Sequence, residues 1–231
     1  MKDGEKIFSA LRAAFPFTIP IMTGFCFLGM AYGIYMNVLG FGVLYPALMA
    51  ALIFGGSLEF IAATMLLSPF APLQTFAVAV MIQARHLFYG LAMLEKYKGL
   101  GLKRQYLIFG LCDETFAINY SARIPEGIDR GWFYFFVTLL NQSYWVMSAM
   151  LGGLLGELLT FDTTGLGFVM TAMFVVIYLE QFLHEKKHIT GAIGFLASTI
   201  CLPIFGNQSF LIPSMVVILI VLTIFRKRIE V

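Results

Sequence analysis

Five ionisable residues lie far from the ends of the long apolar stretches of this sequence: Glu59, Arg85, His86, Asp113 and Glu114. A charged side chain inside a bilayer is costly unless it faces protein or a water-filled cavity and pairs with an opposite charge. Arg85 can bind a carboxylate, and the three acidic residues can accept hydrogen bonds from an ammonium group. An amino acid carries both groups, so this set predicts a transport site for a zwitterion. A buried ion pair that only fixes helix packing is the alternative.

His86 and Tyr89 accompany Arg85 on the same stretch. Histidine titrates near neutral pH, so His86 is a candidate proton carrier that couples transport to the proton gradient, and Glu59 is a second candidate. Tyr89 follows Arg85 by one helical turn and can present its hydroxyl to the same cavity. A hydrogen-bonded core histidine and an ordinary packing tyrosine are the alternatives.

Gly55, Gly56 and Ser57 stand just before Glu59, in the middle of an apolar stretch. Two adjacent glycines weaken a helix, so the chain can turn at this point. Ser57 and Asp113 are residue types that cap helix starts, which predicts free backbone N–H groups that bind a substrate carboxylate. Phe60 and Phe116 are available to line an apolar side-chain pocket. We therefore include all of these residues in the predicted substrate site.

The composition places these residues in a membrane protein. The chain has 231 residues, of which 60% are hydrophobic and only 12% charged, against roughly a quarter charged in a soluble domain. A net charge of +2 argues against nucleic acid as a partner. We expect one all-α transmembrane transporter domain over residues 1–231, embedded in the lipid bilayer. The expected spans are 13–36, 43–67, 73–94, 106–122, 131–156, 165–182, 189–205 and 208–225.

The basic residues predict how these spans cross. If all eight cross, the four cations of 95–105 fall outside, against the tendency of cationic loops to stay in the cytoplasm. If 43–67 and 106–122 instead enter and leave by the same face, every basic residue except Arg85 lies on the cytoplasmic side. We therefore expect about six full crossings, two broken or re-entrant spans, and both termini on the cytoplasmic side of the membrane.

A weak internal repeat supports the broken spans. Tyr32 and Gly33 recur as Tyr89 and Gly90, 57 positions later, and Phe60 recurs as Phe116 after 56 positions. A helix followed by a broken helix, repeated from the opposite face, is typical of inverted repeats in secondary transporters. A chance recurrence of a few residues is the alternative.

One motif points to different chemistry. The segment from His184 through Glu185 to His188 matches H-E-x-x-H, which places two imidazoles around a catalytic zinc with a glutamate as general base. An intramembrane zinc metalloprotease is therefore an alternative function. The segment contains two lysines and sits in a short expected loop, and His86 is the one other histidine of the chain. We favour a basic loop, no metal site, no cofactor and no enzymatic activity.

Three segments, 54–60, 84–90 and 109–116, resemble the signature of the AzlC family, the large subunit of bacterial branched-chain amino acid exporters. The resemblance implies an inner-membrane exporter of valine, leucine and isoleucine, with methionine as a further candidate substrate. It also implies proton-driven transport and a small AzlD-type membrane subunit as partner. Many relatives carry Gln at the position of Glu59, so the resemblance implies that Glu59 adds charge to the site or alters coupling. A non-transporting assembly subunit is a third alternative.

Overall fold

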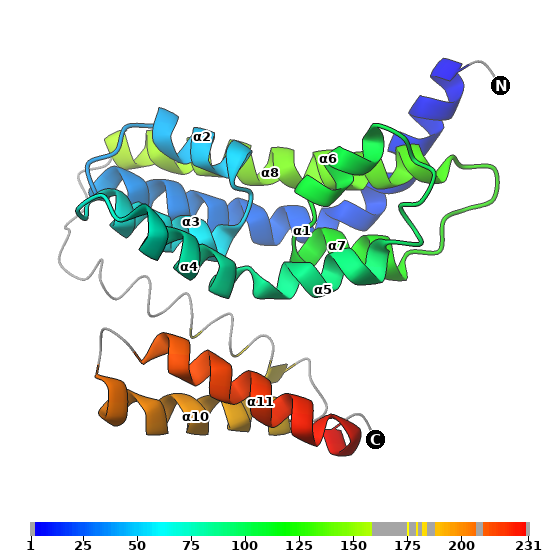
Figure 1. The fold of residues 1–231 in the computed structure, drawn as a ribbon. Helices are drawn as coiled ribbons and strands as arrows, with labels where there is room; N and C mark the ends of the chain where they lie inside the picture. The colour runs from blue at the N-terminus through cyan, green and yellow to red at the C-terminus, as the bar shows by residue number, and fades with distance from the viewer. Residues whose placement is uncertain are drawn as a thin grey trace. The chain divides into compact units, whose positions relative to one another are not determined.

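The computed structural model describes residues 3–158, 175, 179, 182–183, 188–206 and 210–229. Every regular element in these residues is an α-helix (Figure 1), which confirms the predicted all-α class. The chain divides into two compact units, Met1–Thr163 and Thr164–Val231, and each is described by itself.

The first unit contains eight helices in its described part. They are α1 (Asp3–Val38), α2 (Leu44–Leu52), α3 (Gly56–Leu66), α4 (Pro72–Ile82), α5 (Ala84–Met93), α6 (Lys103–Phe109), α7 (Asp113–Ser121) and α8 (Arg130–Leu158).

The second unit contains α10 (Ile189–Phe205) and α11 (Leu211–Ile229), which pack against each other. The predicted span 189–205 coincides with α10, and 208–225 overlaps most of α11. The predicted span 165–182 falls almost entirely outside the described residues.

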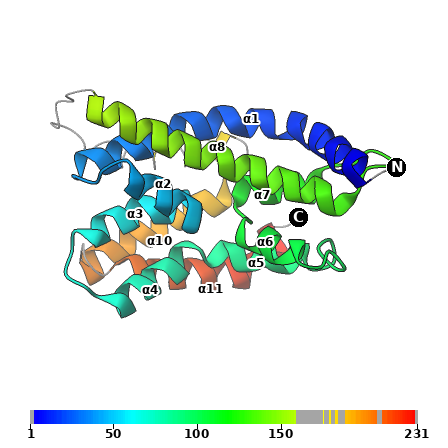
Figure 2. The ribbon, with the colours of Figure 1, turned by 90° about the horizontal axis from the view of Figure 1, so that it is seen from above.

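The two longest helices of the first unit, α1 and α8, lie side by side (Figures 1 and 2). Their backbones touch at small residues. A Cβ atom added at Gly33 of α1 would collide with the carbonyl oxygen of Ala149, and one added at Gly152 of α8 would collide with the carbonyl oxygen of Met30. Small residues allow this close approach in membrane helices, where dispersion contacts replace the hydrophobic effect. The pair forms the support on which the shorter helices pack.

Both predicted broken spans are broken where the sequence indicated. The stretch 43–67 forms α2 and α3, separated at 53–55, where Phe54 has a positive φ of 46°. The stretch 106–122 forms α6 and α7, separated at 110–112. These half-helices have 7 to 11 residues, so each rises about 10–17 Å, well short of a hydrocarbon core about 30 Å thick. Phe54, Leu111 and Cys112 are buried, so both breaks lie inside the first unit.

The expectation of one continuous span over 73–94 is wrong. Here α4 and α5 meet at a bend of 51°, at Gln83, whose φ of −93° and ψ of 9° leave the helical region. Neither Gly nor Pro stands at the bend, so the local sequence carries no breaking signal. The side-chain amide of Gln83 lies against Gly55. A contact between distant segments thus accompanies the bend, and it joins the α4–α5 junction to the α2–α3 break.

The expected number of crossings stays a prediction. By length and composition, Gly4–Val38 is the one described helix that can cross a bilayer alone. The bent pair α4–α5 is a second candidate when it counts as one span.

The Tyr and Phe residues of the predicted repeat contact each other in both parts of the chain. Tyr32 of α1 packs edge-on against Phe60 of α3, with ring centroids 5.0 Å apart. Tyr89 of α5 stacks on Phe116 of α7, with centroids 4.4 Å apart. Each pair joins a helix to the second half of the broken helix that follows it, as the repeat requires.

Candidate functional site

An ion pair joins two of the three helix breaks. Arg85 lies in the first turn of α5, directly after the bend, and Asp113 is the first residue of α7. The guanidinium Nη2 of Arg85 lies 3.0 Å from Oδ2 of Asp113, and the two side chains are 38% and 35% exposed. A carboxylate in the first turn of a helix also interacts favourably with the helix dipole. The pair is therefore held at a junction of helix ends and is still partly accessible.

Several polar atoms around this ion pair have no hydrogen-bond partner among the described residues. They are Nε of Arg85, Oδ1 of Asp113 and Nδ1 of His86, each of them buried. A buried donor or acceptor without a partner costs about 1–3 kcal/mol, so such atoms are explained when a polar ligand completes their bonding. The ion pair keeps one donor and one acceptor for such a ligand.

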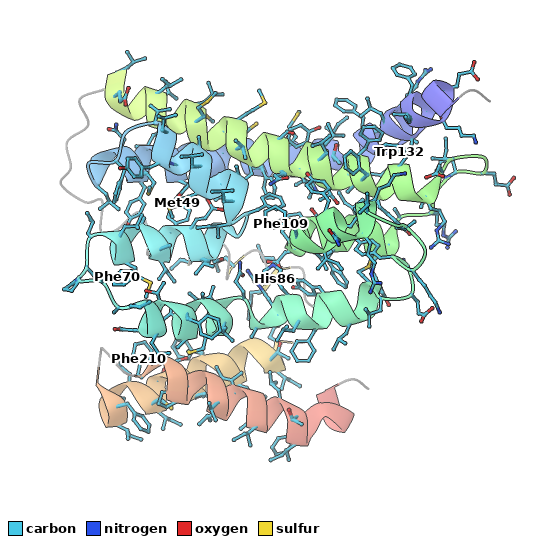
Figure 3. All side chains as sticks on the ribbon, turned by 45° about the horizontal axis from the view of Figure 1, so that its top comes forward. Met49, Phe70, His86, Phe109, Trp132 and Phe210 are labelled. Atoms are coloured by element: carbon cyan, nitrogen blue, oxygen red, sulfur yellow. The ribbon has the colours of Figure 1, made fainter. Side chains whose placement is uncertain are left out.

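Aromatic rings form a wall beside the ion pair. Tyr89 lies between His86 and Phe116, with ring centroids 5.5 Å and 4.4 Å away. Tyr120 extends the stack on the other side of Phe116, at 5.3 Å. Figure 3 labels His86 at the start of α5, in the middle of the first unit. The predicted residues Arg85, His86, Tyr89, Asp113 and Phe116 thus come together.

Glu59 has different partners from those expected. Its side chain is fully buried on α3, where Oε1 accepts hydrogen bonds from the backbone N–H of Gly55 and from Nε1–H of Trp145, both at 3.0 Å. Oε2 lies 3.2 Å from the same indole nitrogen. The ion pair that the described residues give to Arg85 is with Asp113. Glu59 therefore stabilises the α2–α3 break.

The predicted capping roles of Ser57 and Asp113 are wrong. The residue before α3 is Gly55 and the residue before α7 is Cys112, and neither helix start has a side-chain capping bond. The chain turns at Phe54, before Ser57 is reached, and Glu59 reaches back four residues to accept a hydrogen bond from the Gly55 N–H. The carboxylate of Asp113 instead faces Arg85.

The remaining predicted residues lie around the α2–α3 break or in the first turn of α7. Gly56 lies against the ring of Trp145, where an added Cβ would come within 3.2 Å. Phe60 is buried against Tyr32 and Tyr35 of α1. Glu114 is half-buried next to Asp113.

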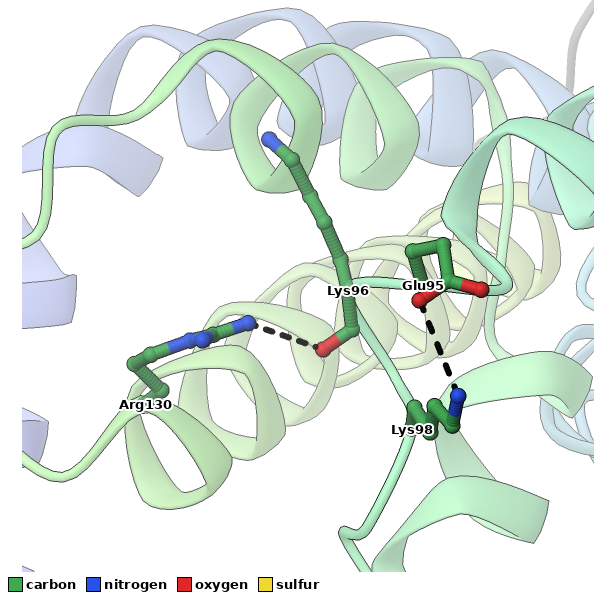
Figure 4. Close-up of polar contacts among 4 residues, drawn as sticks. All are labelled: Glu95, Lys96, Lys98 and Arg130. Carbon is green, nitrogen blue, oxygen red and sulfur yellow. Dashed lines mark hydrogen bonds and ion pairs between the residues drawn. The ribbon is translucent and has the colours of Figure 1, made fainter.

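The loop 94–102 fixes the other ends of the same helices (Figure 4). Arg130, at the start of α8, donates to the carbonyl oxygen of Lys96 at 3.2 Å. The Lys96 ammonium group donates to the carbonyls of Asn119 and Tyr120 in the last turn of α7, where a cation is favoured by the helix dipole. Lys98 and Glu95 form an exposed pair 4.0 Å apart. The loop therefore ties α5, α7 and α8 together.

Four further residues that contact the breaks are not among those predicted from the sequence. They are Gln83 at the α4–α5 bend and the α8 residues Asn141, Gln142 and Trp145. Polar amides in the middle of a long apolar stretch are a usable signal, because each must find a partner when it is buried.

The H-E-x-x-H segment is not tested, because residues 184–187 lie outside the described residues. Its last residue, His188, precedes α10 and stacks on Phe182, with ring centroids 3.9 Å apart.

Comparison with known proteins gives one consistent family. The family model described as AzlC protein matches residues 20–159, which include both broken helices and the ion pair. No solved structure matches this chain.

Curated relatives match over nearly the whole length. The chain is 53% identical to the "Branched-chain amino acid transport protein AzlC" of Bacillus subtilis, covering 100% of this chain and 91% of the relative. It is 48% identical to an "Uncharacterized membrane protein" of Haemophilus influenzae, covering 99% and 94% of the two chains. A Helicobacter pylori protein with the same description is 33% identical over 98% and 99%. This chain therefore belongs to the AzlC family.

Proposed function

We propose that this protein transports branched-chain amino acids across a membrane and that the Arg85–Asp113 pair is its substrate site. The observation that carries the proposal is the partly exposed ion pair at two helix breaks, in which Nε of Arg85 and Oδ1 of Asp113 have no hydrogen-bond partner among the described residues. The name of the Bacillus subtilis relative supports the substrate class.

Each part of the substrate has a matching group. The guanidinium of Arg85 can bind the carboxylate through its fork of donors. Asp113 can accept hydrogen bonds from the ammonium group, with Glu114 next to it in the first turn of α7. The stacked rings of Tyr89 and Phe116 offer an apolar surface to an aliphatic side chain.

The finer parts of the proposal concern transport itself. The direction is export from the cytoplasm, the substrates are valine, leucine, isoleucine and methionine, and a small AzlD-type subunit is the partner. His86 carries the coupling proton, because it lies against Tyr89 at the site and an imidazole can both accept and release a proton. The whole chain acts as one transporter domain in the inner membrane, with both termini in the cytoplasm.

Reconstituted transport tests the site. Proteoliposomes that contain this chain and the small subunit should accumulate or release labelled leucine, and unlabelled amino acids in competition should rank the substrates. Arg85→Ala should abolish transport while the protein still elutes as a folded species. Asp113→Asn should raise KM by roughly tenfold, because it weakens a charge-assisted hydrogen bond worth about 1.5–3 kcal/mol.

Lys98→Ala is the matched control, since it removes a cation from an exposed pair with Glu95 and such pairs contribute little. Its transport should equal that of the unchanged protein. Normal flux in Arg85→Ala would overturn the assignment of the site. A complex that moves no amino acid at all would favour an assembly subunit.

A further inference from the structure

Helix α8 contributes polar side chains to both broken helices within little more than one turn. Asn141 and Trp145 are buried and Gln142 is half-buried. Most buried amide and indole groups make hydrogen bonds, and each of these three side chains makes at least one to a broken helix, although Oδ1 of Asn141 has no partner among the described residues. The hydrogen-bond partners of these three residues therefore show which helices this part of α8 stabilises.

Gln142 bridges the first halves of the two broken helices. Its Nε2–H donates to the carbonyl oxygen of Ala51, near the end of α2, at 3.0 Å. Its Oε1 accepts a hydrogen bond from the hydroxyl of Tyr106 on α6 at 2.6 Å. In a continuous helix the Ala51 carbonyl would accept from the N–H of Gly55, which here donates to Glu59. One amide thus satisfies a carbonyl freed by the first break and binds the helix that leads into the second.

Asn141 and Trp145 hold the second halves. The amide nitrogen of Asn141 lies 3.2 Å from Oγ1 of Thr115 on α7. The indole of Trp145 donates to Glu59 on α3. Thr115 and Glu59 are 56 positions apart in the sequence, the same offset that relates Phe116 to Phe60. Equivalent positions of the two repeats are therefore held by residues one turn apart on one helix.

We propose that Asn141, Gln142 and Trp145 couple the two helix breaks, and that Gln142 is the positioning residue through which a change at one break reaches the other. The inference rests on the proposed function for its purpose, because the breaks carry the substrate site. The coupling itself is a property of the hydrogen bonds and is measurable without transport. Loss of the Gln142 amide frees the Ala51 carbonyl and the Tyr106 hydroxyl at the same time, so both breaks should loosen together.

Cysteine alkylation measures the two breaks separately. The native Cys112 lies in the α6–α7 break, buried and within 3.2 Å of Thr115 Oγ1, so its reaction with N-ethylmaleimide reports opening there. In the first reporter variant, Cys26 and Cys201 are replaced by alanine, so that Cys112 is the one cysteine left. A second protein also carries Cys112→Ala and Ser57→Cys, which reports on the start of α3. Both are the full chain in detergent without substrate.

Gln142→Ala should raise the alkylation rate at both reporters by about fivefold, the size expected when one buried hydrogen bond no longer opposes opening. Ser143→Ala is the matched control, because the hydrogen bond that its hydroxyl makes among the described residues is to the carbonyl of Leu139 within α8. It should leave both rates unchanged. A rise at one reporter alone, or at neither, overturns the coupling.

Tyr106→Phe tests transmission with the loss of a single hydroxyl and decides the question if Gln142→Ala does not fold. It should speed alkylation at Ser57→Cys on α3 as well as at Cys112, although Tyr106 lies on α6. A rise confined to Cys112 refutes the proposal. In transport, both variants should lower the maximal rate by at least fivefold with KM nearly unchanged. Failure of the unchanged complex to transport would refute the proposed function, while the alkylation rates would still decide the coupling.

Discussion

Two acidic residues near the helix breaks have different partners. Asp113 faces Arg85, and its Oδ1 has no hydrogen-bond partner among the described residues. Glu59 is fully buried and its carboxylate is occupied by the Gly55 N–H and by Trp145. The first arrangement suits a group that binds substrate, and the second suits a group that stabilises a break. The charge of Glu59 should therefore matter less than its shape.

Substitution of Glu59 by Gln should retain folding and transport. A single oxygen of Glu59 accepts both short hydrogen bonds, and the amide oxygen of Gln can replace it. Glu59→Ala leaves the Gly55 N–H and the Trp145 indole without an acceptor and should destabilise the protein by about 1–3 kcal/mol. Thermal unfolding in detergent and leucine transport by both variants measure these effects.

The same pair of variants separates structure from proton coupling. If Glu59 carries the coupling proton, Glu59→Gln will lose gradient-driven transport while its unfolding midpoint stays normal. That result would contradict a purely structural role of Glu59 at the α2–α3 break and would make it a residue of the transport site.

At the scale of the helix, small residues decide how closely α1 and α8 approach. Gly33 and Gly152 each face a carbonyl oxygen of the other helix. Membrane helices associate through such close packing, since lipid offers no hydrophobic gain for pairing them. The position of α8 also fixes the three side chains that reach the broken helices. A change in the distance between α1 and α8 should therefore also displace the residues at the breaks.

Substitution of Gly33 by Ala should destabilise the α1–α8 pair by roughly 1–3 kcal/mol, the usual range for overpacking. Gly24→Ala on the same helix is the matched control, because its added Cβ meets nothing within 4 Å. The control should be neutral or slightly stabilising, since Ala favours a helix over Gly. Unfolding midpoints of the two variants in detergent measure the difference. Equal midpoints would show that α1 and α8 can move apart without loss of stability, and would contradict the prediction.

At the scale of the whole molecule, the breaks determine which face each loop reaches. Half-helices of 7 to 11 residues reach about halfway through a hydrocarbon core, so a broken pair can return to the face from which it entered. We therefore expect the basic residues of 95–105 to lie in the cytoplasm.

Cysteine labelling in cells should place the loop 68–72 outside and the loop 95–105 inside. Ser68→Cys should react with an impermeant thiol reagent in intact cells, whereas Lys98→Cys should react only after permeabilisation, in a chain whose native cysteines are replaced. The reversed pattern would mean that the spans 43–67 and 106–122 cross, and it would refute re-entry.

The sequence by itself determined the helical class, the two breaks and the residues of the ion pair. These follow from local causes: paired glycines weaken a helix, and a charge in an apolar stretch must find a partner. The recurring Tyr and Phe positions also contact each other in both parts of the chain, edge-on in the first pair and stacked in the second.

Only the tertiary structure decided the bend at Gln83, the hydrogen bond between Glu59 and Trp145, and the contacts of Gln142 with both broken helices. Each depends on a partner far away in the sequence: Gln83 lies against Gly55, Trp145 bonds to Glu59, and Gln142 joins Ala51 to Tyr106. Hydrogen bonds of this kind depend on the distance and angle between helices. The packing of α1 against α8 sets these distances and angles, and they cannot be predicted from any single stretch of the sequence.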